Sequence, residues 1–469
     1  MGRTRMATDR SARLAVTLTA TAGMFLVMMD SSIVNVALPS IARDLNAPST
    51  SLTLVVLAYL VGAAATMPLS GWLASRCGAR SVLLLALVVF TLASLACALS
   101  RQPGALIAAR AVQGLAGGVI TPVGMGWLLR VHPKGERTRM AAIISVPTAL
   151  APVIALVAGG AIVQNGGWTP IFLINLPIGA AAVIVGCRAL PRTPGAEAPP
   201  RVDATGAILS AAALGLLVTG AGTGPAQHWS PGPTAALVAG IVLLAVLIWQ
   251  QGRAQSPLLH LALLRNPLFG ATTLIVLCAA GGLQGMLFMS ALFLQESMGL
   301  TPLSAGLALV PQALGVLLGI QLASRVLYRL LGPRRLVLSG MTGIAAGACL
   351  LSTVAPGGPQ WLLPAGMIVA GISFGLVQVS LQTAAFASLP VSESPHASAL
   401  FSMIRQVGSA AGIAALATVL GASTDALGAS SSSPAPYHAA LWAAAVLAAT
   451  GGALALRIPD ADAAPTRPS

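Results

Sequence analysis

Long apolar runs dominate this chain and recur from one end to the other, separated by short polar segments. A run of about 20 apolar residues can cross the roughly 30 Å hydrocarbon core of a bilayer as one helix. None of the runs alternates apolar and polar positions, as the strands of a membrane barrel do. The pattern predicts an all-α polytopic membrane protein with about fourteen transmembrane spans. The runs lie at residues 14–38, 51–73, 82–99, 105–128, 140–163, 170–188, 204–222, 234–251, 268–294, 303–328, 335–355, 361–386, 398–420 and 437–457.

Composition supports this class, because 56% of the 469 residues are hydrophobic and only 8% are charged. Soluble domains of ordinary composition contain about 25% charged residues. The formal net charge of +14 would indicate a nucleic-acid partner for a soluble protein. Here the basic residues follow the predicted spans, so we expect a lipid bilayer and no nucleic acid as partner. The five cysteines are isolated, and neither a metal site nor a disulfide framework is predicted.

The distribution of basic residues predicts how the chain is oriented. Most of the 25 Lys and Arg residues fall in connecting segments on the side of the N-terminus. Only Arg43 and Arg101 fall on the opposite side, and Arg110 and Arg405 lie inside predicted spans. Basic loops are retained on the cytoplasmic side of a membrane. We therefore predict a multi-pass protein of the cell (cytoplasmic) membrane with both termini in the cytoplasm.

A short internal repeat predicts the domain organisation. The tetrapeptide Leu-Ala-Ser-Arg after the second run recurs toward the end of the tenth run. If the two halves are six-helix bundles related as parallel repeats, this offset leaves two helices inserted between them. The predicted division is a first six-helix bundle at residues 1–189, a linker with two inserted spans at 190–266, a second six-helix bundle at 267–458 and a cytoplasmic tail at 459–469.

One carboxylate, Asp30, falls inside the first apolar run. A charged side chain in a spanning helix costs about 2.5–3.5 kcal/mol on insertion scales, so an ionisable group there is a functional candidate. The other acidic residues lie in tails, loops or the ends of spans. Asp30 is the predicted proton-titratable site. The alternatives are a carboxylate at the outer mouth of a cavity or one that caps a kinked helix.

The residues around Asp30 read Met29-Asp30-Ser31-Ser32-Ile33-Val34-Asn35-Val36-Ala37-Leu38-Pro39. This stretch resembles the first-span signature of the fourteen-span drug:proton antiporters, a branch of the major facilitator superfamily. Met29 and Ser32 stand where that signature has Leu and Thr. Residues 171–179, which open the sixth span, and residues 294–311 around the start of the tenth resemble the same branch. The resemblance covers nearly the whole chain and implies a secondary transporter.

A second buried charge is expected in the fourth span. Arg110 and Gln113 are three residues apart and share one helix face. A guanidinium inside a span must find a carboxylate, carbonyl groups or water, and Asp30 is the obvious acid. The stretch resembles the family pattern Arg-x-x-Gln-Gly, which implies a role in proton relay. The alternative is that Arg110 snorkels to the interface or packs only structurally.

Residues 71–80, after the second span, resemble the superfamily loop signature Gly-x-Leu-Ala-Asp-Arg-x-Gly-Arg-Lys. Its glycines allow a tight turn, and its arginines can meet helix ends and acids at the cytoplasmic face. Ser75 replaces the family Asp. A charge-based latch between the halves is therefore expected to be weaker here, or to rest on hydrogen bonds. The residues of this predicted conformational loop are Gly71, Ser75, Arg76, Gly78 and Arg80.

The fifth span matches the family least well. The antiporter signature Gly-Pro-x-x-Gly-Gly keeps its last two residues as Gly159 and Gly160, but its Gly-Pro pair is absent. Pro147 and Pro152 lie in the same span, and a proline bends a helix by deleting a hydrogen bond. We expect Pro152, Gly159 and Gly160 to govern helix packing here. The altered signature leaves the direction of transport open.

Six amides within the spans are candidates for lining a substrate cavity. For each one, the alternative is a structural hydrogen bond between helices. The candidates are Asn35, Gln113, Gln284, Gln312, Gln378 and Gln382.

The leading hypothesis is a secondary active transporter, not an enzyme, that exports small hydrophobic compounds such as drugs or antibiotics. Export is expected to run by proton antiport with alternating access, coupled through Asp30 and Arg110. The proton motive force replaces any cofactor, and a monomer is expected to handle the small-molecule substrate and protons. Alternatives are an importer or uniporter on the same fold, or a non-transporting membrane sensor. No span gathers the convergent groups that enzyme chemistry requires.

Overall fold

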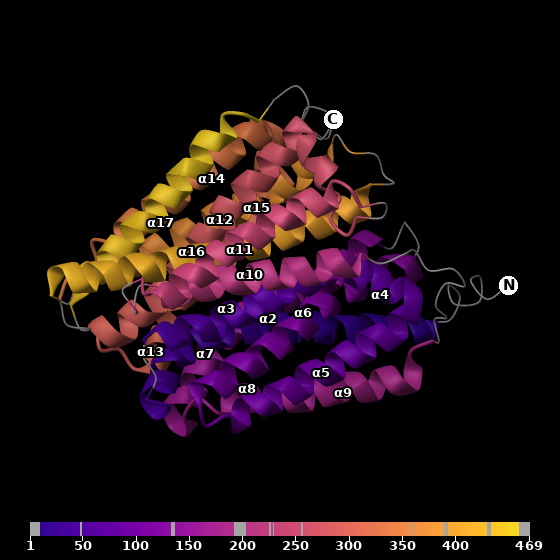
Figure 1. Ribbon diagram of the computed structural model, residues 1–469, viewed down its shortest axis with the longest axis horizontal. Helices are drawn as coiled ribbons and strands as arrows, with labels where there is room; N and C mark the ends of the chain where they lie inside the picture. The colour runs from indigo at the N-terminus through magenta and orange to yellow at the C-terminus, as the bar shows by residue number, and fades with distance from the viewer. Residues whose placement is uncertain are drawn as a thin grey trace.

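Helices form almost the entire chain in the computed structural model (Figure 1). The structure describes residues 10–46, 49–132, 137–191, 203–224, 227, 229–254, 257–355, 357–359, 361–387, 389, 393–428 and 433–458. No strand occurs among these residues. Helices satisfy their own backbone hydrogen bonds, which hydrocarbon surroundings demand. The predicted all-α membrane class is confirmed. The predicted tail at 459–469 and most of the linker into the inserted spans lie outside the described residues.

The helices fall into a first group, an inserted pair and a second group. The first group contains α2 (Arg10–Asp44), α3 (Ser49–Thr66), α4 (Ser70–Cys77), α5 (Ala79–Leu99), α6 (Pro103–Val131), α7 (Arg137–Gly166), α8 (Pro170–Leu173) and α9 (Asn175–Ala189). The inserted pair is α10 (Ala204–Thr223) and α11 (Pro231–Gln251). The second group contains η3 (Leu261–Arg265), α12 (Pro267–Leu292), η4 (Phe293–Ser297), α13 (Pro302–Leu322), η5 (Ala323–Leu327), α14 (Tyr328–Leu351), α15 (Leu362–Ala387), α16 (Ser394–Leu427) and α17 (Pro434–Ala455).

All fourteen predicted apolar runs are helical, and two of them, 51–73 and 170–188, are each divided between two α-helices by a short break. Within the described residues, 11 helices are long and apolar enough to cross a bilayer, or up to 12 if α3 and α4 form one span. These two helices meet at an angle of 55°. Pro68 lies in the break, where it removes a backbone donor. Two further apolar helices, Leu150–Gly166 and Thr205–Ala221, are shorter. A total of fourteen spans therefore stays a prediction.

The second group repeats the contacts of the first. Helix α2 packs against α7 and α9, and α3 packs against α6. In the same order along the chain, α12 packs against α16 and α17, and α13 packs against α15. The contact of α5 with α6 has its counterpart in the contact of α14 with α15. Equivalent pairs in unchanged chain order are what parallel repeats produce. The residue boundaries predicted for the domains stay predictions.

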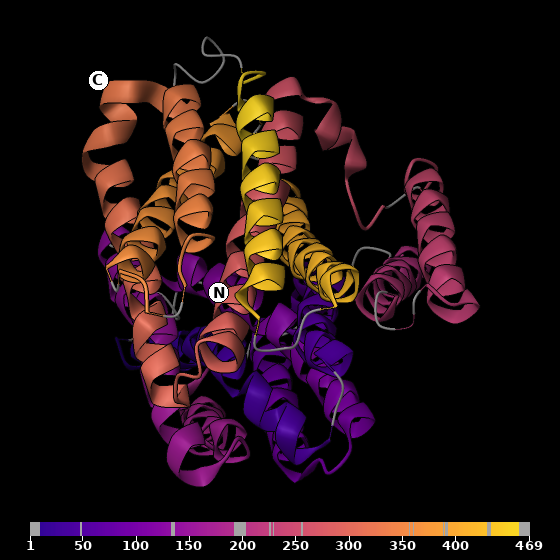
Figure 2. The same cartoon turned by 90° about the vertical axis from the view of Figure 1, so that its left-hand side faces the viewer.

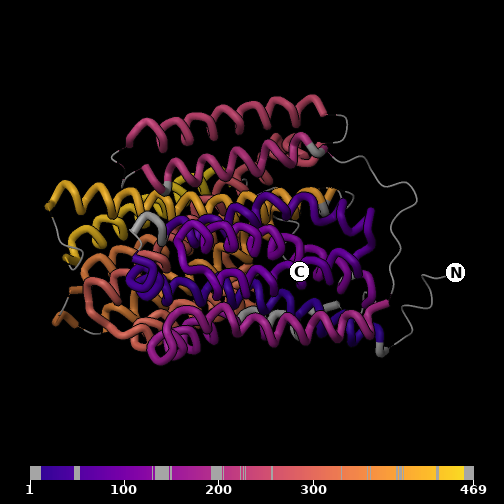
Figure 3. Tube along the Cα trace, turned by 60° about the horizontal axis from the view of Figure 1, so that its bottom comes forward, coloured from indigo at the N-terminus to yellow at the C-terminus, as the bar shows by residue number. Residues whose placement is uncertain are grey.

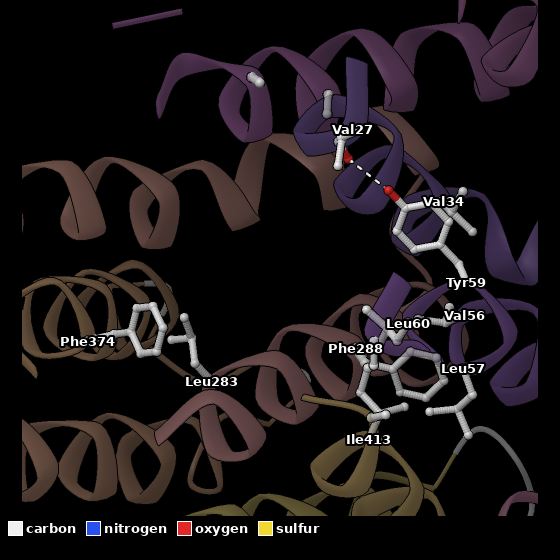
Figure 4. Packing of buried hydrophobic residues seen from close by; sticks show 14 of the residues in the cluster. Val27, Val34, Val56, Leu57, Tyr59, Leu60, Leu283, Phe288, Phe374 and Ile413 are labelled. Atoms are coloured by element: carbon white, nitrogen blue, oxygen red, sulfur yellow. Dashed lines mark hydrogen bonds between the residues drawn. The ribbon is translucent and has the colours of Figure 1, made fainter. Parts of the chain in front are cut away.

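Two equivalent helix pairs join the groups. Helix α7 of the first group packs against α13 of the second, and α3 packs against α16. Figure 4 shows the second of these contacts, where Leu57 and Leu60 of α3 meet Phe288 of α12 and Ile413 of α16. The inserted pair lies beside this arrangement and not at its centre, as Figures 2 and 3 show.

Helix α10 touches both groups, since it packs against α3 and against α16. A cavity of about 280 Å³ lies where these three helices meet. Its lining is almost wholly apolar, and α16 contributes mainly alanines to it. The hydroxyl of Thr418 on α16 donates to the carbonyl of Ala221 on α10 at 3.5 Å. The inserted pair is thus attached to both halves of the molecule.

Glycines set the distance between α7 and α13 at the membrane face where α7 ends and α13 begins. A Cβ atom added to Gly160 would lie 2.6 Å from the carbonyl oxygen of Pro302 and 2.8 Å from the Cα of Leu303. A Cβ added to Gly306 would meet the carbonyl oxygen of Leu156. At the same face, the amide of Gln295 donates to the carbonyl of Val36 at 3.0 Å. The two groups are therefore closely joined at the face opposite the N-terminus.

Gly160→Val should separate α7 from α13, because the obstructing atoms belong to the backbone of α13 and cannot rotate away. Overpacking of this kind costs about 1–3 kcal/mol. Spin labels at Gln164→Cys and Thr301→Cys, on the ends of the two helices, report their distance. We expect a longer distance in Gly160→Val. The matched control is Gly126→Val, since a Cβ at Gly126 meets no atom within 4 Å. An unchanged distance in Gly160→Val would show that this contact does not join the groups.

Candidate functional site

Asp30 lies inside the first group, where α2, α3, α5, α6 and α9 converge. Its side chain is 0% exposed, and that of Arg110 is 1% exposed. The Nη1 atom of Arg110 donates to the Oδ2 atom of Asp30 at 2.5 Å. The predicted contact between the acid and the guanidinium is confirmed. Full burial does not favour two of the alternatives, a carboxylate at the outer mouth of a cavity and an arginine that snorkels to the interface.

Two amides complete the contacts of the carboxylate. The Oδ1 atom of Asp30 accepts from Nε2 of Gln113 at 2.8 Å and from Nδ2 of Asn175 at 2.9 Å. Gln113 also accepts from Nη1 of Arg110, through its Oε1 atom, at 2.7 Å. An ionised carboxylate only accepts hydrogen bonds. Three N–H donors therefore match the ionised state of Asp30.

A hydroxyl and a thiol on α5 hold the two amides in place. The Oγ atom of Ser94 accepts from Gln113 at 2.8 Å and from Asn175 at 3.2 Å, and it donates to the carbonyl of Phe90 at 2.9 Å. The Sγ atom of Cys97 donates to Oε1 of Gln113 at 3.6 Å. These contacts fix which way the Gln113 amide faces, because its oxygen meets donors and its nitrogen meets acceptors.

The guanidinium of Arg110 is held on its other sides by α3 and α8. It lies over the ring of Tyr59 at 4.3 Å and over that of Phe172 at 5.8 Å, measured to the ring centroids. Its Nε atom donates to the carbonyl of Val55 at 3.4 Å. A cation over an aromatic face gains about 2 kcal/mol or more when it is desolvated. The hydroxyl of Tyr59 donates to the carbonyl of Val27 on α2 at 3.3 Å, as Figure 4 shows.

Small residues bring α3 and α6 close enough for these contacts. A Cβ atom at Gly114 would clash with the backbone of Tyr59, and one at Gly118 would clash with the backbone of Ala63. A Cβ at Gly62 would lie 2.9 Å from the nitrogen of Leu115. Close approach through small residues is the usual way in which helices associate in lipid. Because the residues after Arg110 include glycines, α6 can lie close enough to α3 for Arg110 to contact Tyr59.

The other predicted cavity amides do not join this network. Asn35 is buried, and its Nδ2 atom lies 3.4 Å from the carbonyl oxygens of both Ser31 and Ser32. Gln284 and Gln378 are half-buried, and Gln382 is exposed. Gln312 is 3% exposed, and neither polar atom of its side-chain amide has a hydrogen-bond partner in the described part of the chain. Gln113 belongs to the network around Asp30. That these residues line a substrate cavity stays a prediction.

The predicted conformational loop forms α4 and the turn into α5. Gly78 has a φ of 81°, which favours glycine, and it separates the two helices. The Ser75 hydroxyl donates to the carbonyl of Trp72 at 2.8 Å, and the Arg76 guanidinium lies 5.8 Å from the Trp72 ring centroid. Arg80 donates to the carbonyl of Cys187 on α9 at 2.7 Å. These contacts join parts of the first group to each other.

The loop and the fifth span also contain residues whose roles the structure leaves as predictions. Gly71 lies in open space, since a Cβ atom added to it would meet no atom within 4 Å. Pro152 lies inside α7 and is half-buried. A Cβ atom at Gly159 would lie 2.5 Å from the side chain of Ile33 on α2. Gly159 and Gly160 thus face different neighbours, since Gly159 meets α2 and Gly160 meets α13.

No pattern in the sequence singles out Asn175, Ser94 and Tyr59, which all belong to the network. Asn175 stands in a stretch that matched the family, but nothing in the sequence placed it near Asp30. Ser94 and Tyr59 occur singly within apolar runs. Only their positions on neighbouring helices reveal that they meet.

Two repeated helix groups, joined by equivalent helix pairs and carrying a buried ion pair, define a membrane transporter. The family model described as Major Facilitator Superfamily matches residues 20–413, and the chain belongs to this family. The family that the sequence resemblance predicted is confirmed. Membership of this family shows that the protein is a transporter and not an enzyme. It is a multi-pass membrane protein that handles small molecules.

Similar bacterial proteins are named for multidrug resistance. The protein named MdtD of Cronobacter sakazakii (strain ATCC BAA-894) is 31% identical over 402 residues, which cover 85% of this chain and 84% of that protein. MdtD of Salmonella paratyphi A (strain ATCC 9150 / SARB42) is 30% identical over 401 residues, with the same coverage. The chain is therefore similar to proteins of a drug efflux branch.

Solved structures support the fold. A crystal structure of the nucleoside transporter NupG (D323A mutant) has a TM-score of 0.67 at 14% identity, covering 95% of this chain and 99% of that one. An auto-inhibited peptide transporter of the POT family has a TM-score of 0.65 at 17% identity, with 96% of each chain covered. At these identities the likeness concerns the fold alone.

Proposed function

We propose that this transporter exports small, largely hydrophobic compounds, such as drugs or antibiotics, in exchange for protons entering the cell. The observation that carries this proposal is the fully buried carboxylate of Asp30, paired with Arg110 in a spanning helix. Ionisable groups at such positions mark ion and proton pathways. The naming of similar proteins for multidrug resistance supports export of such compounds. The proton motive force would supply the energy, with no cofactor.

Helix α2 connects the Asp30 site to the face where the two groups are joined, so it could transmit protonation of Asp30 to that face. Asp30 faces α6 and α9 through its hydrogen bonds. Further along α2, Ile33 lies against Gly159 of α7, and the carbonyl of Val36 accepts a hydrogen bond from Gln295 of η4. Protonation of Asp30 weakens its attraction to Arg110. In the proposed cycle, this releases α2 to shift at the joined face, so that the groups rock between two states of access.

The proposed orientation places both termini in the cytoplasm of the cell, because basic residues gather on that side of the predicted spans. The face closed by Gly160 and Pro302 would then be the outer one. We further propose that one chain suffices for transport, since the network around Asp30 is complete within a single chain.

Proteoliposomes with an imposed pH gradient test the proposal. A fluorescent hydrophobic cation should move against its gradient only while the pH gradient persists, and its addition should speed the decay of the pH gradient. Downhill movement without proton flux would instead identify a uniporter. Accumulation in the same direction as proton flow would identify an importer, an outcome that the altered signature in the fifth span leaves open. Counterflow of a labelled compound would separate any of these from a sensor.

Neutral and singly cationic compounds should compete for transport better than dications. Each desolvated positive charge needs a partner, and Asp30 is the only acid predicted deep in the spans. The three donors on that carboxylate leave it little capacity for a substrate cation. In a matched dye series we expect dications to bind at least about tenfold more weakly, which corresponds to about 1.4 kcal/mol. Tighter binding of the dications would contradict a single deep acid.

A further inference from the structure

The side-chain oxygen of Asn175 is buried and accepts no hydrogen bond from the network around Asp30. Asn175 is the first residue of α9, separated from the short helix α8 by Ile174, and its side chain is 0% exposed. Its Nδ2 atom donates to Asp30 and to Ser94. Its Oδ1 atom is buried and has no hydrogen-bond partner among the described residues. A buried amide oxygen without a partner is unfavourable, because it has lost its hydrogen bonds to water and gained none in return.

The protonation state of Asp30 explains why the amide faces this way. If the Asn175 amide turned over, its oxygen would approach the Oδ1 atom of Asp30. Two acceptors would then face each other while the carboxylate is ionised. A protonated carboxyl group is different, because it has an O–H donor that requires an acceptor. The turned amide would supply that acceptor.

No other described side-chain carbonyl around the carboxylate is free to accept. Gln113 already uses its carbonyl oxygen for Arg110 and Cys97, and turning it would give up a bond to a charged donor. The Tyr59 hydroxyl donates to Val27. The titratable or charged groups facing Asp30 from the packed helices are Arg110 of α6, Tyr59 of α3 and Cys97 of α5. Among the described groups around the carboxylate, Asn175 has the side-chain carbonyl that accepts no hydrogen bond.

We propose that Asn175 is a positioning residue that recognises both protonation states of Asp30. In the ionised state its Nδ2 atom donates to the carboxylate. When Asp30 takes up a proton, an O–H bond forms on the carboxyl group, the amide of Asn175 turns over, and its Oδ1 atom accepts a hydrogen bond from that O–H. This role rests on the proposed function, in which Asp30 gains and loses the transported proton.

The turn also satisfies the neighbouring hydroxyl. Ser94 accepts from Asn175 and donates to the carbonyl of Phe90 while Asp30 is ionised. A hydroxyl hydrogen rotates to suit its partners. Ser94 can therefore donate to the turned amide oxygen. The exchange needs only side-chain rotations, so the ion pair can be released without moving the start of α9.

Infrared difference spectra between alkaline and acid pH test the role directly, with asparagine labelled by ¹³C at its side-chain carbonyl. We expect two changes on acidification: a carboxylic acid band from Asp30, and a shift of one asparagine carbonyl band to lower frequency. Asp30→Asn should abolish both. Asn175→Leu, which has a similar volume, should abolish only the asparagine shift. The acid band without that shift would show that Asn175 is only a donor and would overturn the inference.

Transport by Asn175→Leu gives a second readout. A residue that only donates to the carboxylate stabilises the ionised state, so its loss should raise the pH of half-maximal export by about one unit or more, since one unit corresponds to about 1.36 kcal/mol. A residue that serves both states should leave this midpoint within about half a unit, equivalent to about 0.7 kcal/mol, and reduce the maximal rate. A raised midpoint with an undiminished rate would overturn the inference.

The spectra also separate this inference from the proposed function. They require neither substrate nor a gradient, so they report on Asn175 even if export fails in its own assay. If the acid band is absent as well, Asp30 does not take up a proton, and both the coupling role and the role of Asn175 are wrong.

Discussion

Asp30→Asn should abolish proton-driven export and reduce it to the level of vesicles without protein. The amide has nearly the volume of the carboxylate but cannot take up a proton, so the coupling step is lost. Breaking a buried ion pair costs about 3–5 kcal/mol. Here the guanidinium of Arg110 keeps Gln113, the Val55 carbonyl and the Tyr59 ring as partners. We therefore expect the variant to fold and insert with reduced stability.

Efflux driven by a pH gradient in vesicles measures this effect. Asp30→Glu is the matched control, since it keeps the titratable group and should retain part of the activity. Counterflow without a gradient should persist in Asp30→Asn, because exchange of compound for compound needs no proton. Gradient-dependent efflux at the wild-type rate in Asp30→Asn would rule out Asp30 as the coupling group.

Arg110→Lys should reduce the initial rate of export by about tenfold to a hundredfold, equivalent to about 1.4–2.8 kcal/mol. The planar guanidinium bonds Asp30 and Gln113 through one nitrogen and Val55 through another, while its face covers Tyr59. A lysine ammonium is a compact point charge that cannot reproduce this geometry. Initial rates at saturating compound in proteoliposomes check the expectation.

The pairing itself can be tested by combining changes. Arg110→Ala leaves the Asp30 carboxylate buried without its counter-charge, so it should be more harmful than Arg110→Lys. The double variant Asp30→Asn with Arg110→Gln removes both charges and should recover stability without recovering coupling. Comparison of the double variant with the single variants Asp30→Asn and Arg110→Gln gives the interaction energy of the two residues. Normal transport by Arg110→Ala would show that the pair is not part of the mechanism.

The sequence predicted the Asp30–Arg110 contact because hydrocarbon surroundings leave a buried charge few alternatives. An acid and an arginine inside two spans must each find a partner, and few others were present. The helices were equally predictable, since apolar runs of sufficient length have no other stable state in a bilayer. Asn175 and Ser94 were not predictable in the same way. An amide or a hydroxyl in an apolar run can bond to any neighbouring helix, and only the packing decides which one it meets.

The same reason limits what the sequence indicated for the fifth span. Gly160 was expected to govern packing, but its contact with Pro302 depends on how the second group sits against the first. The break between α3 and α4 has a local cause in Pro68, which the apolar pattern alone overlooked. A hydropathy pattern shows how long and how apolar each run is, but it does not show where the helix in that run bends.

The attachment of α10 to both groups has a mechanical consequence for the proposed rocking cycle. A helix that touches α3 and α16 at once could not follow both if the groups turned against each other as proposed, so one contact would have to slide. The face that α16 presents there carries Ala410, Ala411, Ala414 and Ala415. Methyl groups this short interlock little with a neighbour. In the proposed cycle, α10 would therefore slide along α16 while it stays packed against α3.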